Sequence, residues 1–338
     1  MMPRDPAITA IIPLFNGAVF IEEALNSVLA QTLPPAKIIV VDDGSTDNGA
    51  DIVAGMAREH NISLIRKPNG GQSSARNLGI AHSETPLIAL LDQDDIWYPH
   101  HLEQLVKPFL EVRYPTLGWV YSNLDQIDRE GRMVMRSCLD QAPHIEHPKR
   151  SLAGCLANDM FILPTSTLIL REAFEAAGGF DERLIGYEDD DLFLRMFRLG
   201  YDNVYLNSGL AKWRIFTGSA SHSPSMRQSR MIYLRKLLEV FPPSDRMGQF
   251  YWRTYLAPRF FPMLLREYRQ AIRSGEVSGI RSAVDDIELI LPFVRRRTGL
   301  VIRLMLPLMT RKSPARVVAK LSEWNLPVVR RLLRLASG

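Results

Sequence analysis

The sequence predicts an α/β fold with a mainly parallel central sheet and flanking helices, followed by an α-helical C-terminal region. Over residues 7–91, apolar β-branched runs alternate with segments whose apolar residues recur at helical spacing. Short acidic motifs directly follow two of those runs, and beyond residue 226 the pattern is almost wholly helical. Alternation of strand and helix in this way is typical of a parallel sheet with helices on its faces.

The elements of the α/β part follow from the spacing of apolar residues and from the Pro and Gly residues that end each segment. Apolar residues at i, i+4, i+5 and i+8 (Phe20, Ala24, Leu25, Val28) predict the first helix, and Pro34-Pro35 ends it. The predicted strands are residues 7–15, 37–41, 62–66 and 87–91, and the predicted helices are residues 19–31, 48–60 and 73–83.

After Tyr98 the pattern loosens but still resolves into elements. We expect helices at 101–112, 172–177 and 189–199, strands at 118–128 and 166–171, a turn at 129–131 with a returning strand near Met133, and irregular chain at 140–160. Helices follow at 227–240, 247–273 and 277–294. The polar, serine-rich stretch 219–229 indicates a boundary, so we expect an α/β domain at 1–225 and a helical region with a basic amphipathic tail at 226–338.

Composition indicates an ordinary globular protein. The 338 residues are 46% hydrophobic and 23% charged, enough for one large or two modest domains. Cys138 and Cys155 have neither metal-ligand nor CxxC spacing, which favours two reduced thiols in the cytoplasm. The N-terminus does not read as a signal peptide, and no stretch approaches the ~20 apolar residues of a spanning helix. We therefore expect a cytoplasmic protein, with a peripheral position on the inner face of the membrane left open.

The positive charge is concentrated in the tail. Residues 295–338 hold eleven basic residues and one acid, a net +10, whereas the whole chain carries +4 and residues 1–294 therefore −6. Apolar residues recur beside these bases at helical spacing, which predicts binding to an anionic membrane surface. A packed helical subdomain with a solvated basic face is the competing interpretation. Nucleic acid is not expected as a partner, because no RNA- or DNA-binding module accompanies the charge.

Four acidic motifs point to the chemistry. They are VVDDGSTD (40–47), LLDQDDIW (90–97), GGFDERL (178–184) and YEDDDLFLR (187–195). The first two end predicted strands, where an α/β sheet binds its ligands. Clustered carboxylates there hold a hard cation, Mn²⁺ or Mg²⁺, which in turn holds phosphate oxygens. The three acids within residues 92–95 would repel one another without such compensation. The motifs therefore predict a nucleotide substrate.

Together with AIIPLFNG (10–17) and NGGQSSARNLGI (69–80), these motifs occur in an order and spacing that resemble the family 2 glycosyltransferases of the GT-A fold. The resemblance covers about residues 7–222. It implies a metal-dependent, inverting hexosyltransferase that uses a nucleotide-diphospho-sugar, by default a UDP-sugar. The implied acceptor is a glycan or a lipid-linked sugar in cell-surface polysaccharide biosynthesis.

The resemblance also implies site residues for the donor. Donor-nucleotide contacts fall on Pro13, Asp43, Gly70, Arg76, Asn77 and Asp92, and the metal on Asp94 with His222. Purely structural roles for several of these residues stay open. Asp42 and Asp43 could cap the following helix, although Ser45 or Asp47 is the better candidate for that cap. Arg76 could form a structural ion pair with a nearby aspartate, and Gly70 could simply form a turn.

For the acceptor side, the resemblance makes Asp189 the general base. A carboxylate in the first turn of a helix is kept ionised by the helix dipole, which suits a base, and one base opposite the leaving group implies inversion. Asp190 and Asp191 are expected to be solvated or structural, with Arg195 pairing with Asp191 at i,i+4. Contacts to sugar, acceptor or diphosphate are assigned to Asp95, Asp181, Glu188, Trp213 and Arg214.

The sequence departs from the family pattern at one metal ligand. Many relatives carry a histidine two residues after the arginine at position 214, and here that position is Phe216. His222 could replace it, or it could be an exposed loop histidine with the third ligand absent.

Two other functions are weighed against transfer of a sugar. A nucleotidyltransferase would need a basic glycine-rich phosphate loop, and residues 10–18 contain no Lys or Arg. A non-catalytic sugar-nucleotide-binding or scaffold protein would have no need for Asp92, Asp94 and Asp189.

Overall fold

The computed structural model describes residues 7–111, 113–216, 225–294, 299–300 and 302–303. The chain divides into two compact units, one made of residues 1–152 and 160–233 and the other of residues 153–159 and 234–338. The boundary expected between residues 225 and 226 lies at the start of α8 (Ser225–Val240) and remains a proposal.

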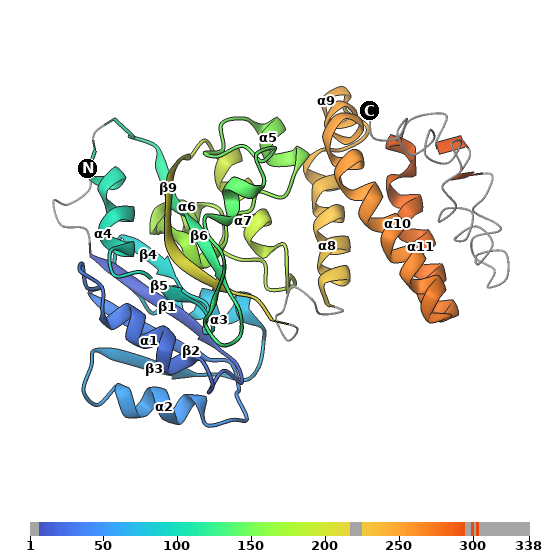
Figure 1. Ribbon diagram of the computed structural model, residues 1–338. Coiled ribbons are helices and arrows are strands. Elements are labelled where there is room, and N and C mark those ends of the chain that lie inside the picture. Colours follow the sequence, from blue (N-terminus) through green and yellow to red (C-terminus); the bar gives the residue numbers. More distant parts are fainter. Residues whose placement is uncertain (1–6, 112, 217–224, 295–298, 301, 304–338) are drawn as a thin grey trace. The chain divides into compact units, whose positions relative to one another are not determined.

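In the described part of the first unit, nine strands form one sheet in the order β3-β2-β1-β4-β8-β6-β9-β5, with β7 paired to β6 (Figure 1). The strands are β1 (Ile8–Leu14), β2 (Lys37–Asp42), β3 (Ile62–Arg66), β4 (Leu87–Leu90), β5 (Ile96–Trp97), β6 (Leu117–Ile127), β7 (Met133–Met135), β8 (Thr167–Leu170) and β9 (Asp202–Arg214). β3, β2, β1 and β4 are parallel, and β8 runs antiparallel to both β4 and β6. The α/β class is confirmed, and the predicted parallel character describes this first half of a mixed sheet.

Helices cover both faces of the sheet because β1 and its neighbours are apolar on both sides. The helices of this unit are α1 (Ile21–Leu29), α2 (Gly49–Met56), α3 (Gln72–Ala81), α4 (His101–Val106), α6 (Arg171–Ala176) and α7 (Glu188–Arg198). Side chains from α1, α2 and α4 join one core cluster. On the other face α3 lies so close to the sheet that a Cβ at Gly79 would meet Ile11 Cγ2 at 2.6 Å.

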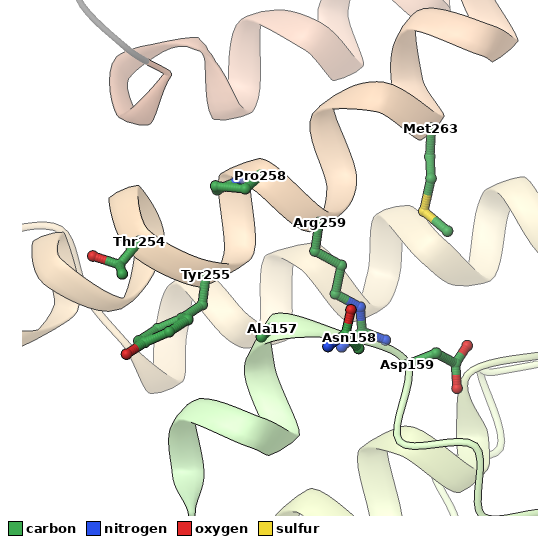
Figure 2. Close-up of a pocket in the computed structure, with 8 residues that line it drawn as sticks. All are labelled: Ala157, Asn158, Asp159, Thr254, Tyr255, Pro258, Arg259 and Met263. Carbon is green, nitrogen blue, oxygen red and sulfur yellow. The ribbon is translucent and has the colours of Figure 1, made fainter. Parts of the chain in front are cut away.

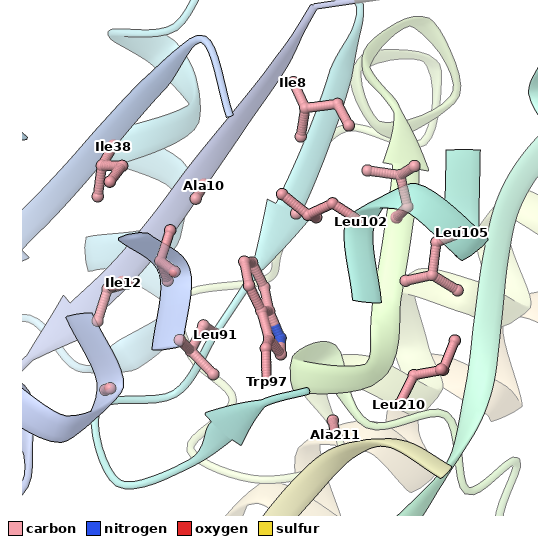
Figure 3. Close-up of a cluster of buried hydrophobic side chains, with 14 of the residues drawn as sticks. Ile8, Ala10, Ile12, Ile38, Leu91, Trp97, Leu102, Leu105, Leu210 and Ala211 are labelled. Carbon is pink, nitrogen blue, oxygen red and sulfur yellow. The ribbon is translucent and has the colours of Figure 1, made fainter. Parts of the chain in front are cut away.

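Trp97 anchors the chain that follows the DQD motif into the core. Figure 3 shows its indole among Ala10, Leu91 and Leu102, which belong to the same buried cluster. Its Nε1 donates to the Thr165 carbonyl at 2.8 Å. The acidic residues just before it are therefore attached to a rigid part of the fold.

The structure adds elements that the periodicity did not indicate. β9 spans thirteen residues and pairs with β6 for most of its length, although its sequence DNVYLNSGLAKWR is too polar and irregular to predict a strand. Short strand β5 and helix α5 (Leu152–Ala157) were also missed, the latter inside the stretch expected to be irregular. The remaining predicted elements are present, with ends that differ by a few residues.

The second unit is helical, as predicted. It contains the end of α8, then α9 (Arg246–Tyr251), a π-helical segment (Trp252–Leu256), α10 (Ala257–Ser274) and α11 (Val277–Ile290). The single helix expected over 247–273 is thus interrupted by the π-helical segment. Trp252 packs there against Phe293 with a ring separation of 4.9 Å. Across the described residues, no helix combines the length and apolar character needed to cross a membrane. Of the basic tail, residues 295–338, only 299–300 and 302–303 are described, so the predicted membrane-binding helices lie outside the described residues.

Candidate active site

Asp43 lies at the carboxyl end of β2 and is held by its own surroundings. Its carboxylate accepts from Lys67 Nζ at 2.5 Å and from the backbone N–H groups of Gly70 and Gly71 at 2.9 and 2.7 Å. The side chain is only 3% exposed. Gly71 has φ +88°, a conformation that favours glycine. A nucleobase that donates to Asp43, as expected from the resemblance, would have to displace Lys67 or use the remaining lone pair on Oδ2.

The N-cap residue of α2 is Asn48, whose side chain makes no capping bond, and Asp47 just before it, one of the two candidates, supplies a side-chain acceptor there. Asp47 Oδ1 accepts from the N–H of Gly49, the first residue of α2, and Oδ2 accepts from the N–H of Ala18. Asp42 instead accepts from the N–H of Ser45 at 3.0 Å and so shapes the turn. Pro13 is buried within β1 opposite Val41 of β2, which puts its backbone beside the Asp43 turn.

Arg76 on α3 connects the end of β4 to the start of α7. Its Nη2 lies 2.5 Å from Asp92 Oδ1 and its Nη1 lies 3.0 Å from Glu188 Oε1. Gln72 also donates to Glu188. Burial opposes the charged form of Arg76, but Asp92 and Glu188 outweigh it and raise the pKa of the guanidinium. The ion pair with an aspartate that the sequence left open is thus present, and the nucleotide contact of Arg76 stays a prediction.

The GGFDERL segment is held as a loop in front of α7. Asn77 exchanges two hydrogen bonds with the backbone of Phe180, at 2.9 and 3.0 Å. Asp181 accepts from the guanidinium of Arg183 at 2.7 and 2.9 Å. Both predicted ligands, Asn77 and Asp181, are therefore engaged in shaping this loop.

The acidic residues Asp92–Asp95, which we call the DQDD loop, follow β4. Gln93 clamps this loop to the end of β1, because it accepts from the N–H of Phe15 at 2.7 Å and donates to its carbonyl at 3.1 Å. Burial raises the pKa of Asp94 to about 6, and the charge of Asp92 adds to the rise. Burial, followed by the charges of Asp94 and Asp92, raises the pKa of Asp95 well above its ordinary range. In both residues the buried surroundings favour the neutral form of the carboxyl group over the charged form.

Arg214, the last residue of β9, lies against the DQDD loop and is 2% exposed. Its backbone N–H donates to Asp95 Oδ1 at 2.8 Å, and its Nε donates to the Asp94 carbonyl at 2.7 Å. Its other donors reach Glu23 of α1 and the carbonyls of Asp128 and Arg129. The contact with diphosphate that was expected for Arg214 would compete with these bonds.

The neighbours of Arg214 are aromatic. Trp213 is partly buried and meets Phe161 edge to face at 6.1 Å. Phe216, at the position where relatives carry histidine, packs against Phe20 at 5.4 Å. His222 lies outside the described residues, so its expected role as a metal ligand stays a prediction.

The four acids that open α7, Glu188–Asp191, differ in burial. Asp190 accepts from the N–H of Met160 at 2.9 Å, and Asp191 pairs with Arg195 at 2.7 Å, which confirms the predicted i,i+4 pair. Both are buried, so they are structural and not solvated. Asp189 accepts from the N–H of Asp190 at 2.8 Å and is the only one of the four that is partly exposed. It is therefore the acid of this group that a substrate can reach.

The carboxylates of the DQDD loop suit a hard divalent cation. Asp92 offers the oxygen that does not face Arg76, and the pKa of Asp94 is raised first by burial and then by the negative charge of Asp92. A cation would relieve that repulsion, and carboxylate oxygens are the donors that Mg²⁺ and Mn²⁺ prefer. Among the described residues, no group of three or more His, Cys, Asp or Glu is arranged to hold a metal. Further ligands would then come from phosphate oxygens and water.

A pocket of about 410 Å³ occurs elsewhere, within the second unit (Figure 2). It is lined by the π-helical segment and α10 on one side and by residues 157–159 on the other. None of the strand-end carboxylates lines it. This pocket is therefore separate from the acidic motifs of the first unit.

Sequence reasoning missed three residues that shape the site. Lys67 and Gln93 hold Asp43 and the DQDD loop, and Gln72 bonds to Glu188. Lys67 precedes the Pro-Asn-Gly-Gly turn and Gln93 lies between the two aspartates, so adjacency to the motifs was the available signal.

Comparison with known proteins gives a consistent result. The sequence profile described as glycosyl transferase family 2 matches residues 9–178. An uncharacterized glycosyltransferase of Rickettsia conorii, RC0461, is 34% identical over 193 residues, which cover 57% of this chain and 31% of the relative. The chain spans 28–50% of the length of the first four curated relatives that it matches.

Two solved structures share the fold. Residues 1–349 of S. aureus TarS in complex with UDP-GlcNAc align with a TM-score of 0.62 at 18% identity, over 94% of this chain and 91% of that one. The mannosyltransferase PcManGT of Pyrobaculum calidifontis, in complex with GDP-Man and Mn²⁺, aligns with a TM-score of 0.52 at 19% identity, over 98% and 86%. At these identities the likeness shows the fold alone, and it confirms the fold expected from the motifs.

Proposed function

This chain belongs to glycosyl transferase family 2, and we propose that it transfers a sugar from a nucleotide-diphospho-sugar to a glycan or lipid-linked acceptor with inversion. The observation that carries the proposal is the Arg76 bridge. One buried guanidinium holds both Asp92, at the predicted donor site, and Glu188, the residue before the predicted base. The two halves of the site are thereby kept together. A UDP-sugar is the proposed donor, supported by the UDP-GlcNAc complex of TarS.

Asp189 takes the proton in the proposed mechanism. The acceptor hydroxyl oxygen attacks the anomeric carbon while the bond from that carbon to the diphosphate oxygen breaks, and the hydroxyl proton passes to the Asp189 carboxylate. Attack from the side opposite the leaving group inverts the anomeric carbon. Asp189 lies in the first turn of α7, where the positive end of the helix dipole favours a negatively charged side chain, which suits a general base.

Asp92 and Asp94 would hold Mn²⁺ or Mg²⁺, with His222 as a further candidate. When bound, the cation supplies positive charge that stabilises the departing nucleoside diphosphate. The Mn²⁺ in the PcManGT complex supports this part of the proposal. The side chains of the loop do the positioning: Gln93 ties the loop to β1, and Asp95 is fixed by the backbone of β9.

The test is a screen of sugar nucleotides that measures release of nucleoside diphosphate, with Mn²⁺ and with a chelator. We expect release with at least one donor in the presence of the cation and none after chelation. Asp189→Asn serves as the control, because it should bind the donor and release nothing above background. Binding without release by the wild-type chain, across all donors and acceptors tested, would instead indicate a non-catalytic sugar-nucleotide-binding protein.

We also propose that the chain works at the cytoplasmic face of a membrane and that residues 295–338 bind anionic lipid. The net charge of +10 in that segment supports this, since each basic residue near an anionic surface contributes about 1 kcal/mol. The full chain should co-sediment with anionic but not with neutral vesicles, and less so as salt rises. The matched variant replaces Arg330, Arg331 and Arg334 with glutamate. Equal sedimentation of this variant and of the wild-type chain would contradict the proposal.

A further inference from the structure

We propose that Arg214 is a positioning residue, which fixes the DQDD loop so that its carboxylates face the donor. The expected effect on cation binding rests on the proposed function, whereas the contacts of Arg214 with the DQDD loop are present in the structure itself. Arg214 was expected to contact diphosphate, and its geometry points to a different role.

Arg214 holds the DQDD loop by two consecutive residues. Its backbone N–H donates to the Asp95 carboxylate at 2.8 Å, while its Nε donates to the backbone carbonyl of Asp94 at 2.7 Å. The first bond fixes a side chain and the second fixes the peptide plane directly after Asp94 Cα. Together they set the direction in which the Asp94 side chain leaves the loop.

The rest of the guanidinium is tied to elements that do not belong to the loop. Nη2 lies 2.6 Å from Glu23 of α1, and Nη1 donates to the carbonyls of Asp128 and Arg129, at 3.1 and 2.8 Å. The Phe20 ring lies below it, 5.0 Å from the guanidinium carbon. All three guanidinium nitrogens are thus bonded to protein, which leaves Arg214 to act on the donor through Asp94 and Asp95.

The loop needs such support because its acids repel one another. Burial and the neighbouring charge of Asp92 raise the pKa of Asp94 to about 6, and the positive charge of Arg214 works against that rise. Four of the five guanidinium N–H donors of Arg214 are hydrogen-bonded, so its buried charge can compensate the neighbouring carboxylates at a low desolvation cost.

Lysine could not replace Arg214. The guanidinium is a planar fork whose three nitrogens bond in fixed directions, whereas a lysine ammonium is a single point with three donors. At this position a lysine could not reach the Asp94 carbonyl, Glu23 and the β6–β7 turn at the same time.

The test compares Arg214→Lys with Arg171→Lys. Arg171 is a matched control because it also bonds two carbonyls, those of Thr85 and Ile80, and pairs with a glutamate, Glu175. It belongs to α6 and has no contact with the DQDD loop among those described. Two quantities are measured: amide hydrogen exchange of residues 92–97 in the ligand-free chain, and Mn²⁺ affinity in the presence of UDP.

We expect Arg214→Lys to speed exchange in residues 92–97 and to weaken Mn²⁺ binding by about 10- to 100-fold, as for other residues that orient metal ligands. Arg171→Lys should change neither. Unchanged exchange at the loop in Arg214→Lys would overturn the inference. Equal losses in both variants would overturn it too, because they would indicate a general loss of stability.

Glu23→Ala provides a second variant if Arg214→Lys does not fold. Glu23 is 55% exposed, so its removal leaves no buried charge on α1 and frees only the outer end of Arg214. We expect a smaller increase of exchange confined to residues 92–97, and no increase there would contradict the positioning role. If the wild-type chain binds neither Mn²⁺ nor UDP, the proposed function fails, while the exchange data still decide the role of Arg214.

Discussion

The DQDD loop and the acidic start of α7 have nearly the same composition, but their acids differ in how their charges are compensated. At α7, Glu188 meets Arg76, Asp191 meets Arg195, and Asp190 accepts from a backbone N–H. In the DQDD loop, burial and mutual repulsion raise the pKa values of Asp94 and Asp95. Asp92 of the loop also pairs with Arg76, and Arg214 lies beside Asp94 and Asp95, but the pKa values of these two acids remain raised. The difference teaches that two short acidic motifs of similar sequence can be compensated in different ways, which is consistent with the separate roles proposed for them.

Asp189→Asn should have the largest effect and tests the α7 side of the comparison. Asparagine has nearly the same shape but cannot take a proton, so kcat should fall by about 10²- to 10⁴-fold while donor affinity is kept. Steady-state release of nucleoside diphosphate and calorimetric donor binding measure the two quantities. Asp190→Asn is the matched control, since its amide oxygen can still accept from Met160, and it should retain most activity. Similar rates for the two variants would remove Asp189 from the role of base.

Asp94→Asn tests the DQDD side. Loss of a charged metal ligand should weaken cation-dependent donor binding by at least about 100-fold, and a chelator should then make no further difference. Isothermal titration with and without chelator measures this. Asp51→Asn, which alters an aspartate that is 81% exposed, should leave the affinity unchanged. A donor affinity for Asp94→Asn that still responds to chelator would place the cation elsewhere.

Glu188→Gln breaks the compensation that distinguishes α7. Arg76 is 1% exposed and would keep only Asp92 as a charged partner, so we expect a loss of about 2 kcal/mol in the free energy of unfolding. Urea denaturation measures it. A stability equal to that of the wild type would show that Asp92 alone suffices for Arg76.

The smallest expected effect is the change of Mn²⁺ affinity with pH, which tests the raised pKa of Asp94 in the DQDD loop. Because the pKa of Asp94 is raised from its ordinary 3.8 to about 6, the folded chain binds this proton more tightly than the unfolded chain. Asp94 alone therefore makes the cation-free fold more stable as pH falls from about 6 to about 4, while cation binding weakens. Mn²⁺ affinity should drop about tenfold between pH 7 and pH 5. An affinity that stays constant over this range would contradict the raised pKa.

The parallel half of the fold was predictable because its signals are local. Strands β1, β2 and β4 are buried apolar runs, and acidic motifs directly follow β2 and β4 in the sequence. β9 was not predictable, since its polar residues become strand only by pairing with β6, whose sequence lies some eighty residues earlier.

The same limit applies to the site. The motifs identified Asp92, Asp94 and Asp189, which follow strand ends or open a helix. They could not show that Arg214 reaches Glu23, 191 residues away in sequence, or that Arg76 reaches Glu188, 112 residues away. Contacts of this range are set by the topology of the sheet, and no local pattern in the sequence encodes them.

The two ion pairs made by Arg76 have a thermodynamic consequence. Asp92 and Glu188 share one guanidinium. Any ligand that strengthens or weakens the Arg76–Asp92 ion pair therefore also changes the free energy of the Arg76–Glu188 pair. Linkage is reciprocal: if binding of cation and donor changes the affinity of α7 for an acceptor, binding of the acceptor changes their affinity by the same factor. The two substrates should therefore bind interdependently, and the sign and size of their cooperativity would be set by a single buried side chain.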